Sequence, residues 1–167
     1  MMRVLLIIGI CTMSLSTLTV VSAQKADPQD KTHPKVFLIG EQPDVFEALN
    51  EDYPKLLLEI CGKDMKLAYG KWIDMLQAME QHAEKMSFDI RGVKMWMKVF
   101  WDKKGNIQHI AYHLMPDSKN VRAKILAAFF RDFMKHYQTP CETDDNFSQY
   151  STASFPTFAQ RVKKGKR

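Results

Sequence analysis

Two methionines and two histidines in neighbouring segments are the residues whose types suit a metal ion. Met95 and Met97 are two residues apart, and His109 and His113 are four apart, so each pair shares one face of a β-strand. Thioether sulfur and imidazole nitrogen are ligands for Cu(I), a soft ion. A hairpin turn with one bulged glycine brings both histidines beside Met97, whereas a register shifted by one residue separates them. A Cu(I) site is therefore one hypothesis, and its alternative is a methionine-lined core strand with surface histidines.

Nucleophilic residues near the C-terminus form no recognisable catalytic motif. Neither Ser151 nor Ser154 lies in a G-x-S-x-G sequence. His136 and Cys141 are five residues apart across an expected helix end, a spacing that sets no geometry for a nucleophile and its base. We therefore assign no catalytic residue and expect no cofactor. An enzyme whose active residues converge only in three dimensions is a second hypothesis.

The N-terminal 23 residues have the organisation of a cleavable signal peptide. Arg3 gives a positive start, residues 4–18 carry no charge, and Val21-Ser22-Ala23 offers small residues to a signal peptidase. Interspersed serines and threonines weaken the alternative, an uncleaved anchor, because a spanning helix needs ~20 predominantly apolar residues. We expect a secreted or periplasmic protein that begins at Gln24 and does not insert stably into a membrane.

Two cysteines remain after this cleavage, Cys61 and Cys141. In an oxidising compartment such a pair predicts one disulfide. On the chain-entropy model, a loop of about 80 residues closed in this way stabilises the fold by ~4 kcal/mol. Two separately buried thiols are the alternative.

The positive charge of the chain is concentrated at its end. There are 24 basic and 19 acidic residues, and residues 161–167 contain Arg161, Lys163, Lys164, Lys166 and Arg167. The rest is nearly neutral, so no basic face favours nucleic-acid binding. Residues 24–34 are predicted to be a flexible leader and 161–167 a basic tail, on either side of a single domain over 35–160.

Two long amphipathic helices are predicted, at about residues 64–86 and 120–137. In both, apolar residues recur at steps of three and four, with Asp64 as the N-cap of the first and Phe129, Phe130 and Phe133 on the buried face of the second. A strand over 35–39 and a short helix over 44–49 precede them. The period of residues 56–60 leaves strand and helix open.

A β-hairpin gives the strongest strand signal, at about residues 94–101 and 107–114. Asp102 and Gly105 suit the turn between its strands, and residues 150–155 offer one more strand. Helices packed on one face of a small antiparallel sheet predict an α+β fold.

Both faces of this hairpin are apolar, and only one of them can cover the helices. The other is either covered by the N-terminal region or left open to a partner, since large apolar patches tend to be binding sites. The candidate binding surface consists of Trp96, Phe100, Trp101, Tyr112 and Tyr150.

Residues 95–155 resemble the C-terminal domain of TonB-type proteins. A hydrophobic strand, a D-x-x-G-x-I turn at Asp102, Gly105 and Ile107, a second strand, a link containing Ser118 and a helix ending near Pro140 carry the resemblance. Residues 150–155 correspond to the last strand of that domain. The resemblance implies a shared topology with a sheet edge offered to an extended peptide, and it transfers no binding residue.

These observations together favour an exported binding, adaptor or structural domain that uses an exposed sheet face or edge. A protein or peptide is the expected partner. The enzyme and the Cu(I)-binding protein are the alternatives.

Overall fold

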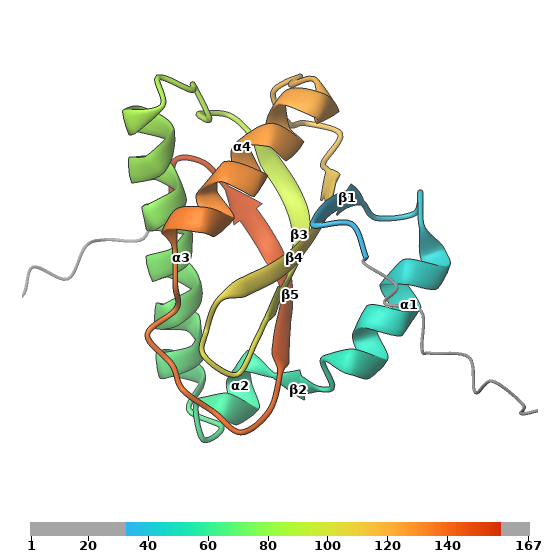
Figure 1. The fold of residues 1–167 in the computed structure, drawn as a ribbon. Helices are drawn as coiled ribbons and strands as arrows, with labels where there is room; N and C mark the ends of the chain where they lie inside the picture. The colour runs from blue at the N-terminus through green and yellow to red at the C-terminus, as the bar shows by residue number, and fades with distance from the viewer. Residues whose placement is uncertain (1–32, 158–167) are drawn as a thin grey trace, which may run out of the picture. The chain divides into compact units, whose positions relative to one another are not determined.

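The computed structural model describes residues 33–157, which confirm the predicted α+β class (Figure 1). The elements are β1 (Val36–Leu38), α1 (Pro43–Asp52), β2 (Lys55–Leu56), α2 (Leu57–Ile60), α3 (Met65–Lys85), β3 (Lys94–Trp101), β4 (Ile107–Leu114), α4 (Ala123–His136) and β5 (Phe147–Ser154). The predicted signal peptide (1–23), nearly all of the leader (24–34) and the basic tail (161–167) lie outside the described residues.

The sheet is mixed, whereas the sequence predicted an antiparallel one. Its strand order is β1-β4-β3-β5-β2. The central strand β3 is antiparallel to β4 and β5, but β1 pairs parallel with β4 and β2 pairs parallel with β5. Only β3 and β4 are joined by a tight turn, which forces antiparallel pairing. The longer connections of β1 and β2 leave their direction to packing, which the local sequence does not reveal.

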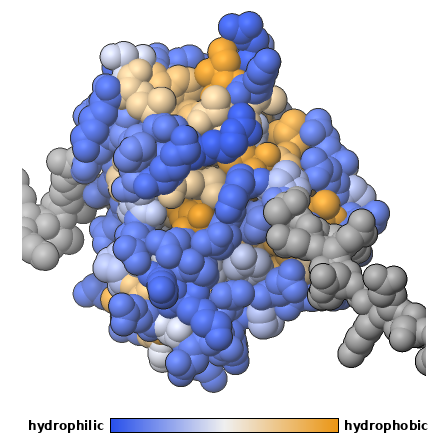
Figure 2. Space-filling model, in the orientation of Figure 1, coloured by the Kyte–Doolittle hydropathy of each residue, from blue (hydrophilic) through white to orange (hydrophobic). Residues whose placement is uncertain are grey.

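One face of the sheet is covered by α3 and α4. The odd-numbered side chains of β3, Met95, Met97, Val99 and Trp101, are buried there against both helices. The three phenylalanines predicted for the buried face of the second long helix are in this core, as expected. In the view of Figure 2, hydrophobic residues reach the surface only in separate patches between hydrophilic ones.

The opposite face is covered by α1 at one end only. Phe100 of β3 is buried under α1, where it contacts Tyr53 at a ring-centroid distance of 5.3 Å. The Lys98 amine donates to the Asn50 side chain and lies 5.4 Å from the centre of the Phe46 ring, and burial lowers its pKa. A helix of ten residues is only about 15 Å long, so α1 does not reach the Trp96 end of the face, and no other element of residues 33–157 covers that end.

The hairpin has the predicted turn but a different register along most of its length. Next to the turn, Asp102 N–H donates to the Asn106 carbonyl at 2.9 Å, as a one-residue glycine bulge requires. A second irregularity between Phe100 and Trp101 then shifts the pairing by one residue. As a result Trp96, not Met95, lies opposite His113.

Several element boundaries also differ from the predicted ones. Residues 56–60, left open by their period, divide between the end of β2 and the helical turn α2. The last strand begins at Phe147 and not at Tyr150, because β3 pairs with it along its whole length. The second long helix is shorter than predicted at both ends, whereas Asp64 caps α3 as expected by accepting a bond from Leu67 N–H at 3.0 Å.

The turn at Gly105 holds the segment that follows α4. Gly105 has φ +82°, and its carbonyl accepts a bond of 2.8 Å from Thr139 N–H. A Cβ at this position would overlap the Thr139 carbonyl oxygen. Gly40 has φ +96°, but a Cβ added there would meet nothing within 4 Å. Both glycines therefore have a left-handed backbone that other residues rarely adopt, and only Gly105 also lacks the space for a side chain.

Gly105→Ala should destabilise the protein clearly more than Gly40→Ala. Both changes carry the left-handed backbone cost of ~1–2 kcal/mol, and only the first adds a clash with Thr139. Urea unfolding of the two variants measures the difference. Equal losses would mean that contact with Thr139 does not constrain the turn.

Trp101→Ala and Trp96→Ala should affect stability very differently. Trp101 is 1% exposed and stacks on Phe147, so its truncation should cost ~3–5 kcal/mol. Trp96 is 43% exposed and loses mainly one stacking contact, worth ~1 kcal/mol. Thermal or denaturant unfolding measures both. A severe loss in both variants would show that the Trp96 face is covered.

Candidate functional site

An exposed aromatic pair lies on the part of the sheet that α1 does not reach. Trp96 is 43% and Tyr150 49% exposed, and their rings stack with centroids 5.9 Å apart and planes 16° apart. The pairing of β3 with β5 puts Trp96 opposite Thr152 and Lys98 opposite Tyr150, so the two rings are diagonal neighbours on one face. The strand register thus places two large side chains together in solvent.

The outer edge of β5 is adjacent to this pair. The backbone N–H and C=O groups of successive residues in a strand point to opposite sides. The Lys94 carbonyl of β3 accepts a bond from Met115 N–H on the β4 side, so the backbone groups of Met95 point to β5. Because Met95 lies opposite Ala153, the odd-numbered residues of β5 bond to β3 and the even-numbered ones point outward. β2 pairs only with Phe147 and Ser148, and no strand within residues 33–157 pairs with the outer side of 149–154.

An open groove of about 370 Å³ separates this edge from α3. Trp72 lies in its wall and donates from Nε1 to the outward-pointing Thr152 carbonyl at 3.2 Å. The groove is lined by uncharged residues, namely Tyr69, Trp72, Ile73 and Leu76 of α3 and Ser151, Thr152, Ser154, Pro156 and Thr157. We call the outer side of residues 149–154, this groove and the Trp96–Tyr150 pair the β5 edge site.

The five residues of the predicted binding surface separate into two groups. Trp96 and Tyr150 are exposed and together, whereas Phe100, Trp101 and Tyr112 are each no more than 1% exposed. Phe100 packs under α1. Trp101 and Tyr112 belong to the core on the helix side, where the Tyr112 hydroxyl donates to the Ala123 carbonyl. These three residues are structural, and the sequence did not distinguish them because all five are large and aromatic.

The four residues of the predicted Cu(I) site do not converge. Met95 and Met97 are fully buried on the helix side of the sheet. His113 is exposed on the other face, opposite Trp96, and His109 lies opposite Phe100. His109 donates from Nδ1 to the Pro34 carbonyl at 2.9 Å, and burial lowers its pKa. The second bulge of the hairpin is the reason, since it moves the histidines to the face opposite the sulfurs.

The predicted disulfide is not present, because Cys61 and Cys141 are both free thiols. Cys61 is buried in the core on the helix side, and Cys141 packs against that core. Burial raises the pKa of the Cys61 thiol, with the Lys71 ammonium opposing the rise and the Cys141 thiol adding to it. The spacing of two cysteines along the chain does not fix the Cβ separation of ~3.8 Å that a bridge needs.

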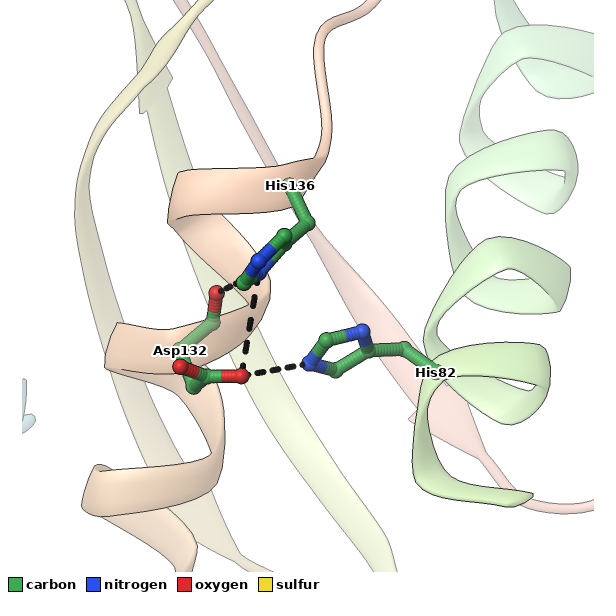
Figure 3. A group of neighbouring side chains, drawn as sticks. All are labelled: His82, Asp132 and His136. Atoms are coloured by element: carbon green, nitrogen blue, oxygen red, sulfur yellow. Dashed lines mark hydrogen bonds and ion pairs between the residues drawn. The ribbon is translucent and has the colours of Figure 1, made fainter. Parts of the chain in front are cut away.

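A cluster of two histidines and one aspartate joins α3 to α4, and the sequence patterns did not predict it (Figure 3). His82 Nε2 lies 3.0 Å and His136 Nδ1 3.7 Å from Asp132 Oδ2. Asp132 and His136 are one helical turn apart, a spacing visible in the sequence, but His82 lies fifty residues earlier. Only the packing of the two helices brings the third residue to them.

Among the described residues, no helix combines the length and the apolar character needed to cross a membrane.

Searches against protein-family models, curated proteins and solved structures gave no match. The resemblance to the TonB C-terminal domain therefore stays a prediction, and the function has to be inferred from the geometry of the β5 edge site.

Proposed function

We propose that this protein is an exported binding domain that takes up an extended peptide segment of a partner protein as an additional strand on β5. The observation that carries the proposal is the outer side of residues 149–154, with which no strand of residues 33–157 pairs, next to an exposed aromatic pair. Strand addition is a common way for a sheet edge to bind a peptide.

Backbone hydrogen bonds would supply much of the affinity. The even-numbered residues of β5 turn their N–H and C=O groups outward, and these are the groups that an added strand pairs with. The Thr152 carbonyl is already bonded to Trp72, but a carbonyl oxygen has a second lone pair. The edge can therefore bind a further strand without losing the contact that anchors it to α3.

Side chains of the bound segment would alternate between two surfaces. Those on one side would contact Trp96 and Tyr150, and those on the other would enter the groove beside Tyr69 and Ile73. Among residues 33–157, the groove has no charged lining residue, in contrast to the charges by which many edge strands avoid pairing. A segment with apolar or small uncharged residues fits both surfaces, which favours such a peptide over an acidic or basic one.

Thr152→Pro tests the role of the edge. The change removes an outward N–H and places the proline ring in the path of an added strand, while the bonds from β5 to β3 are kept. Peptides selected from a random library on the wild-type domain should bind the variant at least about tenfold more weakly, which corresponds to ~1.4 kcal/mol. Ile125→Ala is the control, because Ile125 is a similarly exposed apolar residue on α4.

Fluorescence anisotropy of a labelled selected peptide measures these affinities, and circular dichroism checks that each variant is folded. Trp96→Ala is the second variant in case Thr152→Pro does not fold, and it should also weaken binding. The proposal is wrong if no peptide is selected, or if selected peptides bind Trp96→Ala and a folded Thr152→Pro as tightly as wild type.

A further inference from the structure

In the His82–Asp132–His136 cluster, the two histidine–carboxylate separations are close to those that a small tetrahedral ion needs. Nitrogen and oxygen ligands of Zn²⁺ lie ~2.0–2.2 Å from the ion, so two of them are ~3.3–3.6 Å from each other in a tetrahedron. The two histidine–carboxylate distances, 3.0 and 3.7 Å, bracket this value. All three donor atoms lie within 4.8 Å of one another. The carboxylate distances need to change by only a few tenths of an ångström, and the two histidine nitrogens would have to approach each other by up to about 1 Å for an ion to lie between them.

The type of donor determines which ions fit. Two imidazoles and one carboxylate form a borderline set that suits Zn²⁺ and similar divalent transition metals. The cluster contains no thioether or thiolate, the ligands that Cu(I) prefers. It is therefore a different kind of site from the methionine and histidine site that the sequence predicted.

Packing orients one of the three residues, His82. The His82 ring lies between Phe129 and Phe133 of α4, with ring centroids 5.8 and 5.7 Å away. Oδ2 of Asp132 is directed at the two histidines, and Oδ1 lies 3.6 Å from Nζ of the exposed Lys135. Ligands that packing orients before an ion arrives lose less conformational freedom when it binds.

Solvent reaches the cluster from one side. The side chain of His82 is 13% exposed, that of Asp132 32% and that of His136 60%. An ion can therefore enter past His136, and a fourth coordination position is left for water, as in zinc sites with three protein ligands. His136 Nδ1 now bonds to the Asp132 carbonyl at 2.9 Å, and it would exchange its proton and this bond for the ion.

We propose that His82, Asp132 and His136 bind one Zn²⁺ ion, which clamps α3 to α4 on the helix side of the sheet. The ion would bind the folded chain only, because the unfolded chain does not bring His82 near the other two residues. It should therefore stabilise the protein in a concentration-dependent manner. This site is independent of the β5 edge site, since none of its three residues lines the groove or belongs to the aromatic pair.

Titration of the metal-free full chain with Zn²⁺ in a calorimeter tests the proposal, with Co²⁺ absorption as a second readout. Wild type should bind one ion per chain, show the visible bands of tetrahedral Co²⁺, and melt at higher temperature as Zn²⁺ is added. His136→Gln, at the most exposed ligand, and Asp132→Asn should each lower the affinity at least about tenfold. His113→Gln is the control, because it removes an exposed histidine from the opposite face of the sheet.

Circular dichroism of the metal-free variants shows whether they are folded, and His136→Gln should be, because its side chain is mostly in solvent. The cluster would be only a hydrogen-bonded contact between helices if wild type binds no Zn²⁺. The same holds if folded His136→Gln binds the ion as tightly as wild type, or if His113→Gln weakens binding as much.

Discussion

The alternation of side chains along β3 is the constraint on which the rest of the structure depends. Hydrogen bonds to β4 and β5 on both sides fix this strand in the centre of the sheet. Its odd-numbered side chains then fill the core under α3 and α4. Its even-numbered side chains face the other way, where α1 covers Phe100 and leaves Trp96 in solvent. A one-residue slip would exchange these two sets and bury the wrong residues, so packing strongly specifies the register.

Sequence patterns predicted the elements with a local signal and missed what depends on contacts between elements. The spacing of apolar residues in the hairpin and in the two long helices can be recognised within a single stretch of sequence. The same is true of the Asp64 cap and of the Asp102–Gly105 turn. The parallel pairing of β1 and β2 and the shift between Phe100 and Trp101 have no such signal. The same limit applies to function, because Trp96 and Tyr150 were predicted among five aromatic residues that composition alone could not separate.

Helix α3 contributes to both of the sites inferred from the structure. Residues between Tyr69 and Leu76 of this helix line the groove beside β5, and His82 near its end faces α4. Its exposure is uneven, since Tyr69 is 61% exposed at the groove, whereas Trp72, which bonds to the edge of β5, is almost fully buried. The helix thus supports the sheet through buried contacts, and its residues at the groove are uncharged.

Hydrogen exchange of the β5 amides, measured by NMR on the protein without any peptide, tests most directly whether this strand has a free edge. The account predicts an alternating pattern, because the amides of Ser151 and Ala153 bond to β3, while those of Thr152 and Ser154 point outward. Ser151 and Ala153 should exchange slowly and Thr152 and Ser154 quickly. Equal protection of all four amides would mean that the outer side of β5 is already covered, and would contradict the central claim.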